Sequence, residues 1–425
     1  MHEADVSVID CGTDWLIDSG RRGGGGGGGG GGTVAGGQRP AARLNIDAAS
    51  QRRRLPHPPA ALDSRQRKHH LPLGKSVVAA ADGSAAWIKS GRCGMLQADG
   101  RTLRGRCTQS GGGVGRNLAD ALARTGPPPL LVSAVGDDQF GRFLLAETLS
   151  HVDTSAVDVR RDGRTACYTA VLDKHGECHM GIGDMNIHDL ITPSLILKSE
   201  QKLRESCMIL MDGNIPQETV DLILKLAEDG DIPVWFEPTD VSKSIKPFRS
   251  SLWKSLYAFS PNLNELKMMA REAGFPVNMS LSIQKSSPEE VLEEVTRLGN
   301  YLVNESISAT AVVTLGNIGL AIIRRGKPDE PFYAQGKWLK QTGDISARLY
   351  PAKKVTNLVN VMGAGDCLAA GFIRGMLLGL SEERCAAVGL ACASAALNND
   401  CAVPVRLLSE NAIRQTTAAE FLSLH

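Results

Sequence analysis

A carboxylate follows directly after a glycine-rich turn in the segment Gly363-Ala364-Gly365-Asp366. Small residues let backbone N–H groups converge on an anion there, and the positive end of a following helix dipole attracts negative charge. Because a carboxylate repels phosphate, Asp366 is better suited to take a proton from an attacking hydroxyl than to bind the anion. The alternative is that Asp366 only caps a helix. The segment favours a kinase that acts on a small molecule.

The residues on both sides of this turn predict the elements that hold Asp366. The apolar side chains of 355–361 indicate a strand before the turn, and residues 367–380 carry apolar side chains at helical spacing after it. A strand, a tight turn and a helix would place the carboxylate at the helix N-terminus.

A second glycine-rich segment, Gly111 to Gly115, leads into another helical pattern near Asn117. It is a poor dinucleotide fingerprint, because no good parallel strand directly precedes it. Gly112 and Gly113 would instead let a ligand approach the backbone, and the Asn117 amide could bind vicinal hydroxyls of a sugar. The alternative is a glycine-rich loop with a polar residue in the first helical turn.

Two further motifs suit a metal and a nucleotide. Asn262 and Glu265 have the spacing of a helix cap and could also place Mg²⁺ through its retained waters. Thr314, Gly316 and Gly319 lie at the end of a predicted strand, in a turn that could line a nucleotide pocket or form only a hairpin.

Several polar residues carry weaker signals. Asp184 and Asn186 follow a predicted hairpin and could face a sugar, although ordinary loop residues are the simpler interpretation. His175, His179 and His188 lack a metal-binding geometry, and we expect them on the surface.

Short apolar runs alternate with helical patterns from about residue 75 onward. Strands are predicted at 130–135, 207–211, 234–236 and 311–315, and helices at 140–149, 218–227, 263–273 and 289–304. Residues 165–172 and 178–182 instead predict a β-hairpin joined around 174–176. Strands separated by helices indicate an α/β fold with a doubly wound, mostly parallel sheet, covered on both faces, beside a small β element.

Composition limits the class of protein. The 425 residues are 42% hydrophobic and carry a net charge of +1, which gives no general attraction to nucleic acid or to anionic membranes. The ten cysteines are scattered, and no apolar run approaches the roughly 18 residues needed to span a bilayer. We therefore expect a cytoplasmic protein with small-molecule partners and with neither nucleic acid nor membrane as a partner.

Three segments are expected along the chain. Residues 1–72 contain a run of ten glycines and basic clusters, cannot bury enough surface to order themselves, and are predicted to be disordered. Acidic residues at the start make organelle or nuclear targeting the less favoured interpretation of this basic leader. Residues 73–415 are predicted to form the α/β domain, with its small β element from about 93–110 and 160–186, and residues 416–425 a C-terminal tail.

Five motifs, in this order and spacing, resemble those of the ribokinase-like, PfkB-type carbohydrate and nucleoside kinases. They are Gly112-Gly113-x-x-x-Asn117, Val135-Gly136-x-Asp138-x-x-Gly141, Asn262-x-x-Glu265, Thr314-Leu-Gly316-x-x-Gly319 and Gly363-Ala-Gly-Asp366, and the resemblance covers about residues 100–410. Within this family, the segments that look most like pseudouridine kinases are 97–100, 109–117, 183–187, 212–215 and 236–238.

The resemblance implies a ribokinase-like fold with a small β lid, ATP as the donor, and transfer to the primary hydroxyl of a ribose-like group. It makes Asp366 the catalytic base and Gly363, Ala364 and Gly365 the anion hole. Gly112, Gly113 and Asn117, joined by Asp184 and Asn186, would contact the substrate; Thr314, Gly316, Gly319 and Asn398 would line the nucleotide site; and Asn262 with Glu265 would hold Mg²⁺ through water. Lids in this family often help to form homodimers.

Two positions depart from the family pattern. Asn360 stands where members commonly carry an aspartate that helps to order a monovalent-cation loop, which leaves a K⁺ requirement open. The family's first strand usually delivers an aspartate to the sugar, whereas here residues 77–82 form a weak strand pattern with Asp82 as the counterpart.

The leading hypothesis is an ATP-dependent kinase of a nucleoside 5′-hydroxyl, with pseudouridine as the substrate. Another sugar or nucleoside kinase, for ribose or adenosine, is the first alternative. A catalytically weak nucleoside-binding protein is the second, because the first strand departs from the family pattern.

Overall fold

The computed structural model describes residues 77–82, 86–93, 105–172, 178–307, 309–355 and 358–424. The predicted disordered segment 1–72, segment 97–100 and the predicted hairpin turn at 174–176 with His175 lie outside these residues, as does the side chain of His179. No helix in the described part of the chain is long and apolar enough to cross a membrane.

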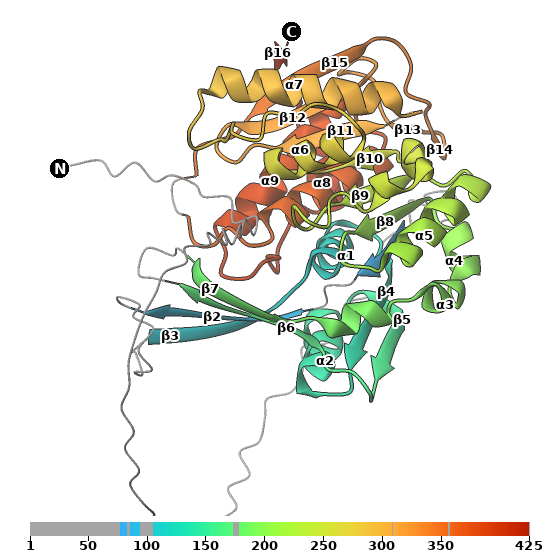
Figure 1. Cartoon of the computed structure of the whole chain (residues 1–425), viewed down its shortest axis with the longest axis vertical. Coiled ribbons are helices and arrows are strands. Elements are labelled where there is room, and N and C mark those ends of the chain that lie inside the picture. Colours follow the sequence, from blue (N-terminus) through green and yellow to red (C-terminus); the bar gives the residue numbers. More distant parts are fainter. Residues whose placement is uncertain are drawn as a thin grey trace, which may run out of the picture. The chain divides into compact units, whose positions relative to one another are not determined.

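A ten-stranded sheet organises the described residues (Figure 1). Across the sheet the strands are β16 (Leu422–Leu424), β15 (Ile345–Pro351), β12 (Gly319–Arg325), β11 (Thr310–Thr314), β10 (Ala258–Phe259), β9 (Val234–Glu237), β8 (Met208–Asp212), β1 (Val77–Asp82), β4 (Leu130–Gly136) and β5 (Asp153–Arg160). The strands from β11 to β5 are parallel, and β12, β15 and β16 are antiparallel additions. The predicted α/β class is confirmed, and the weakly patterned first strand, β1, lies inside the sheet between β8 and β4.

Alternate side chains of the inner strands enter two separate cores, because successive residues of a strand face opposite sides of the sheet. Ile209 and Met211 of β8 pack into one core, whereas Met208 and Leu210 pack into the other. The elements that cover the first face are α3 (Pro193–Leu197), α4 (Glu200–Arg204), α5 (Gln217–Gly230), α6 (Leu263–Glu272) and α7 (Pro288–Glu305). Those that cover the second are α1 (Val114–Thr125), α8 (Ala364–Leu377), α9 (Glu382–Leu397) and α10 (Glu410–Gln415).

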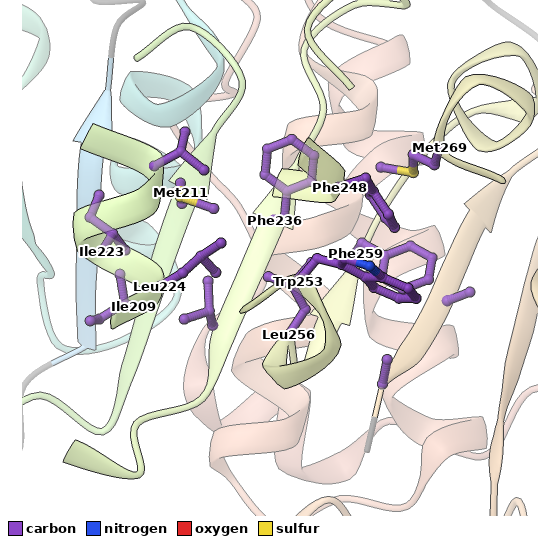
Figure 2. Close-up of a cluster of buried hydrophobic side chains, with 14 of the residues drawn as sticks. Ile209, Met211, Ile223, Leu224, Phe236, Phe248, Trp253, Leu256, Phe259 and Met269 are labelled. Carbon is purple, nitrogen blue, oxygen red and sulfur yellow. The ribbon is translucent and has the colours of Figure 1, made fainter. Parts of the chain in front are cut away.

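Aromatic side chains fill the first core beside β9 and β10 (Figure 2). Phe248 packs against Trp253 with ring centroids 4.9 Å apart, and against Phe259 at 6.2 Å in an edge-on arrangement. Such offset contacts add to the free energy gained by burying the rings. They fix the part of the sheet from which Glu237 and Asn262 emerge.

A separate four-stranded sheet, here called the second sheet, lies outside the main one (Figure 1). Its strands, in order, are β3 (Gly105–Gly112), β2 (Ala86–Cys93), β6 (Ala166–Leu172) and β7 (Cys178–Asp184). The antiparallel pair β6 and β7 is the predicted hairpin. β2 was not predicted, and it extends the small β element upstream of residue 93. Sequence pattern missed it because β2 pairs in parallel with β6, about 80 residues away, and no local pattern connects the two segments.

The predicted strand before the Gly363–Asp366 turn is wrong. The described residues of 352–361 lie in no strand, although Val359 and Val361 are apolar. The backbone N–H groups of Val359 and Asn360 instead donate to the Leu397 carbonyl at 2.9 and 3.3 Å. The segment is therefore a loop held by the end of α9, a partner that sequence pattern does not reveal.

The region beyond residue 415 is part of the domain. β16 pairs antiparallel with β15, so the chain predicted as a tail from residue 416 contributes a strand to the main sheet. The remaining small elements are α2 (Gln139–Phe143), the π-helical turn Leu144–Thr148, the 3₁₀ turns Asn186–Leu190, Pro247–Arg249 and Ser251–Ser255, and the two-residue strands β13 (Tyr333–Ala334) and β14 (Lys337–Trp338).

A buried ion-pair cluster ties α9 to the antiparallel strands. The carboxylate of Glu382, fully buried at the start of α9, forms an ion pair with Arg324 at 2.6 Å, and it accepts from Arg348 at 2.7 Å and from the Tyr350 hydroxyl at 2.7 Å. Buried charges are tolerated when they are paired and hydrogen-bonded in this way. The cluster fixes the start of α9 against β12 and β15, at the end of the helix opposite to Leu397, which receives the loop before Asp366.

Candidate active site

Polar groups follow four parallel strands at one edge of the main sheet. Asp212 ends β8, Glu237 ends β9, Asn262 comes shortly after β10, and Thr314 ends β11. The carboxyl ends of parallel strands meet at one edge, which is where open α/β sheets bind ligands. Asn262 and Thr314 form a parallel bridge. The predicted metal motif and the predicted nucleotide motif are therefore neighbours.

Two helix N-termini meet at this edge. α1 follows Gly113 and α8 follows Gly363, and the Asn117 amide nitrogen of α1 donates to the Asp366 carboxylate oxygen Oδ2 of α8 at 2.6 Å. Both side chains are at least nine-tenths buried. The structure thus brings together the predicted catalytic base and a predicted substrate-binding residue that lies 249 positions away in the sequence.

The glycines of the turn have different roles. Gly363 has φ of +77°, and a Cβ atom there would lie 2.3 Å from the Ala402 carbonyl oxygen, so only glycine fits. At Gly365 a Cβ would meet no atom within 4 Å. The first N–H groups of a helix have no acceptor within the helix. The Ala364 N–H donates to the Val361 carbonyl at 3.4 Å. The N–H of Gly365, in the first turn of α8, can therefore face an anion in the open space beside it.

Burial controls the charge of Asp366. Removal from water raises the pKa of this carboxyl to about 7, and the nearby charge of Asp212 acts in the same direction. The hydrogen bond from Asn117 and the positive charge of Arg116 lower the pKa but do not cancel these effects. A base with a pKa near the working pH can both accept and release a proton, which is the property general-base catalysis requires.

Glu237 is a second buried carboxyl group at this edge, and no role for it was predicted from the sequence. Burial, followed by repulsion from Asp366 and Glu265, raises its pKa well above the usual range. Its Oε2 contacts the Ser260 hydroxyl closely, and the Trp235 indole donates to that hydroxyl at 2.8 Å. Its position at the end of a buried strand is the sequence signal that could have identified it.

Asp212 was likewise cited only as part of a resemblance. It is buried, accepts from the Asn214 backbone N–H at 2.9 Å and from the Asn214 amide at 3.0 Å, and the Asn214 oxygen accepts from Lys243 at 2.7 Å. These contacts hold a carboxylate beside Asp366 at the same edge. Asp212, too, directly ends an apolar strand.

The predicted metal motif forms a helix cap. Asn262 Oδ1 accepts from the N–H groups of Asn264 and Glu265 at 2.9 and 3.0 Å, and Glu265 Oε2 accepts from the Asn262 N–H at 2.8 Å. Direct ligation of a metal would compete with this capping box. No cluster of three acidic, histidine or cysteine side chains in the described residues is placed to hold a metal directly. Oxygen donors beside mutually repelling carboxyl groups do fit Mg²⁺ held through its waters.

The predicted nucleotide residues occupy two places. Thr314 and the turn through exposed Gly316 to Gly319 lie beside Asn262, with the Leu315 N–H donating to the Gly319 carbonyl at 2.9 Å. Asn398 is exposed at the end of α9, where its amide donates to the Ser394 carbonyl at 2.7 Å. The link to the catalytic turn runs through the neighbouring Leu397 carbonyl.

Asn360 joins the loop before Gly363 to the segment after α9. Its oxygen accepts from the Met362 N–H at 3.0 Å, and its amide donates to the Asp400 carbonyl at 3.4 Å. The neutral Asn360 side chain therefore connects the two segments by hydrogen bonds, at the position where members of the resembled kinase family commonly carry a charged aspartate. A K⁺ requirement stays a prediction.

The predicted substrate residues near the second sheet are arranged differently from one another. Gly112 is buried at the end of β3, and Gly113, with φ of +108°, begins α1. Asp184 ends β7 and pairs with Arg164, while Asn186 is exposed. No hydrogen bond or ion pair described for this region joins Asp184 or Asn186 to Asp366.

His188 is not a surface residue, contrary to the prediction. Only 6% of it is exposed, and burial, with Lys243 and Lys246 nearby, lowers its pKa to about 4 despite the opposing charge of Asp212. The short 3₁₀ turn Asn186–Leu190 packs this ring inward. The sequence around this turn has no periodic apolar pattern from which the burial of His188 could be predicted.

The motif around Asp138 is structural. Its carboxylate accepts from the Gly141 N–H at 2.8 Å, from the Thr165 N–H at 2.8 Å and from the Thr165 hydroxyl at 2.7 Å. A Cβ at Gly136 would lie 2.6 Å from the Thr165 nitrogen, and one at Gly141 would lie 2.2 Å from the Gly136 oxygen. The motif thus joins the end of β4 to the start of β6, and so the main sheet to the second sheet.

A buried carboxyl group with a pKa near 7, two converging helix N-termini and open space beside Gly365 fit a phosphotransferase that acts on a hydroxyl acceptor. The chain belongs to the pfkB family of carbohydrate kinases, whose family model matches residues 93–402.

Sequence relatives and solved structures agree with this family. A pseudouridine kinase of Arabidopsis thaliana is 27% identical over 361 residues, covering 77% of this chain and 93% of that protein. A pseudouridine kinase of Escherichia coli (strain K12) is 28% identical over 289 residues, covering 68% and 80%. The structure of Arabidopsis thaliana ribokinase complexed with ribose and ATP matches with a TM-score of 0.62 at 18% identity, covering 81% of this chain and 99% of that one. The last similarity concerns the fold alone.

Proposed function

We propose that this protein is an ATP-dependent kinase that phosphorylates the 5′-hydroxyl of a nucleoside, with pseudouridine as the substrate. The observation that carries the proposal is the buried Asp366 carboxyl, hydrogen-bonded to Asn117 and placed beside the open N-terminus of α8. Two relatives named pseudouridine kinase support the choice of nucleoside. We expect the enzyme to act in the cytoplasm.

The proposed reaction is an in-line transfer. The substrate hydroxyl oxygen attacks the γ-phosphorus of ATP, the bond from that phosphorus to the bridging oxygen breaks, and ADP leaves. Asp366 accepts the hydroxyl proton, and Asn117 holds the Asp366 carboxylate in place. The Gly363-Ala364-Gly365 turn forms the anion hole, in which the Gly365 N–H and the positive end of the α8 dipole stabilise the charge on the transferred group.

The nucleotide would lie along the neighbouring strand ends. Thr314, Gly316 and Gly319 would line its site, together with Asn398, and Asn262 with Glu265 would hold Mg²⁺ through water. When bound, the metal would neutralise charge on the phosphate oxygens. The capping box keeps these two side chains fixed before any ligand arrives.

A substrate panel tests the proposal. Purified protein with Mg-ATP is offered pseudouridine, uridine, adenosine, ribose and fructose, and phosphorylated product is measured by mass spectrometry, with Asp366→Asn as the catalytic control. We expect pseudouridine 5′-phosphate as the main product. Absence of product with every substrate would refute the kinase, and preference for free ribose would refute the nucleoside assignment.

A binding measurement separates catalysis from recognition. A nucleoside that raises Tm without any ADP being released would identify a catalytically weak binding protein in place of an enzyme. A rise in Tm together with ADP release supports the kinase.

A further inference from the structure

Asn117 is held from both sides of its amide group. Its nitrogen donates to Asp366 Oδ2 at 2.6 Å, and its oxygen accepts from Arg116 Nη1 at 2.9 Å. An asparagine amide can turn over, which exchanges its donor and acceptor ends, so its neighbours decide which end faces which group. Here a carboxylate lies at the donor end and a guanidinium at the acceptor end.

These two neighbours differ in how firmly they fix the amide. While Asp366 is ionised it can only accept a hydrogen bond, and the Asn117 nitrogen must face it. Once Asp366 has taken a proton it can donate, and it would then tolerate the Asn117 oxygen. Arg116 has donors only and stays charged at every accessible pH, so it holds the Asn117 oxygen in both states of the base.

We propose that Arg116 is a positioning residue that keeps the Asn117 amide nitrogen directed at Asp366 throughout the catalytic cycle. This inference rests on the proposed function of Asp366 as the base. An amide that cannot turn over offers no acceptor to protonated Asp366, so the proton is released readily and the ionised base is restored.

A buried carboxylate on the next turn of α1 holds Arg116 in position. Asp120, 1% exposed, accepts from Arg116 Nη2 at 2.7 Å through one oxygen. Its other oxygen accepts from Arg124 at 2.5 Å and is 2.7 Å from His151 Nε2. Arg116 itself is 4% exposed and uses one terminal nitrogen for Asn117 and the other for Asp120. A planar guanidinium can make both contacts at once, whereas a lysine ammonium cannot keep this geometry.

Other charged groups face Asp366 and set the background for any titration. Asp212 from β8 acts on Asp366 through its negative charge. The carboxyl group of Glu237 on β9, whose pKa is raised by burial and by Asp366, and the buried Cys367 thiol on α8, whose pKa is also raised by burial, are the other titratable groups beside it. Arg116 supplies the positive charge from α1. Removal of Arg116 should therefore make Asp366 easier to protonate, by loss of charge and by release of the amide.

The test is a titration of Asp366 in the full-length protein without substrate. Carbon NMR of ¹³C-carboxyl aspartate labels, with the Asp366 signal assigned by its absence in Asp366→Asn, follows the carboxyl group directly. In Arg116→Met we expect the midpoint to rise by about one pH unit or more, the usual size of such an effect. The acidic limb of the pH profile of kcat/KM should move to higher pH by the same amount.

A matched control removes the other guanidinium at Asp120. Arg124→Met leaves the contact between Arg116 and Asn117 intact, so we expect its titration midpoint to match that of the native protein. Equal shifts in both variants, or no shift in Arg116→Met, would overturn the proposal. If Arg116→Met does not fold, Arg116→Lys is used: an intermediate shift supports the proposal, and a native midpoint overturns it.

A double variant distinguishes an effect of Arg116 on the orientation of the Asn117 amide from an effect of its charge on Asp366. In Asn117→Ala there is no amide to orient, so adding Arg116→Met should shift the midpoint by much less than it does in the native protein. An undiminished shift would mean that Arg116 acts by charge alone, which contradicts a positioning role. The titration needs no substrate. If the expected shifts in the Asp366 midpoint are found but none of the tested substrates is phosphorylated, the proposed function is rejected and this inference stands.

Discussion

The Asp366 carboxyl group is subject to opposing influences. Burial raises its pKa to about 7, while the Asn117 amide and Arg116 favour the ionised form. The ionised form is the one that can accept a proton. Activity and stability should therefore depend on pH in opposite directions.

The first prediction concerns activity against pH. We expect kcat/KM to fall about tenfold per unit below pH 7, because only the ionised base is active and this quantity reports the free enzyme. Measuring kcat/KM from about pH 5 to about pH 9 checks this prediction. An acidic limb near pH 4, the range of an ordinary aspartate, would contradict the proposed base.

Asp366→Asn provides the companion measurement. Its kcat should be about 10² to 10⁴ times lower than native, the usual scale for loss of a general base. Since the pKa of Asp366 is about 7 in the folded protein and 3.8 is its usual value, its ionisation removes stability as the pH rises from about 4 to about 7, and the loss stays constant above that. The variant should therefore have a higher Tm than the native protein at alkaline pH. Near-native turnover would remove Asp366 from this role.

The two glycines of the turn make a matched pair for the second prediction. Gly363→Ala should lower stability, by about 1 kcal/mol for the positive φ and by more for the contact with the Ala402 oxygen. Gly365→Ala meets no neighbour, so its stability should be near native, yet its methyl group would enter the space assigned to the anion and lower kcat. Thermal melts and initial rates distinguish them, and equal losses of stability would contradict the assignment.

At the scale of elements, the site depends on how α1 packs against α8. Their N-terminal turns meet through Asn117 and Asp366. Farther along α8, buried Arg374 donates to the Leu122 and Pro127 carbonyls at 2.9 and 3.1 Å, near the end of α1. The two helices are thus joined at both ends, with their N-termini on the same side.

The third prediction tests this second junction. Arg374→Met would leave the two carbonyl groups without this donor, so we expect a loss of about 1–3 kcal/mol in the free energy of unfolding and a lower kcat. Arg384→Met is the control, because Arg384 also donates to carbonyls, those of Thr416 and Arg414, but away from α1. Denaturant unfolding and initial rates are compared. A kcat that falls equally in both variants would argue against a role for the helix junction.

At the scale of the whole molecule, the second sheet presents an edge strand with exposed apolar side chains. β7 is the last strand of that sheet, and Met180 and Ile182, two positions apart on one face, are 45% and 61% exposed. Edge strands with such side chains are ready to pair with another chain. This is the surface through which we propose that a homodimer forms.

The fourth prediction is that Ile182→Glu shifts the protein from dimer to monomer, because charges facing each other across a symmetric interface would repel. Val159→Glu is the control, since Val159 is 49% exposed but belongs to β5 of the main sheet. Sedimentation velocity measures both variants beside the native protein. A native monomer, or dimers in both variants, would exclude this interface.

The residues of greatest chemical significance were identifiable from sequence because their signals are local. Gly363 to Asp366, Asn262 with Glu265, and the strand and helix periodicities depend on neighbours within a few positions, and the structure confirms the α/β fold they predict. Local signals failed where the partner is distant: β2 pairs with β6, and Val359 and Asn360 donate to the Leu397 carbonyl at the end of α9.

The sequence by itself determined the α/β fold with its mostly parallel sheet, and it predicted a base and an anion turn, because these follow from residue type and short-range spacing. Only the tertiary structure placed Asn117 against Asp366, added Asp212 and Glu237 to the same edge, and buried His188. Burial and charge proximity, which set the pKa of Asp366, depend on segments hundreds of residues apart. They exist only once the sheet has brought its strand ends together.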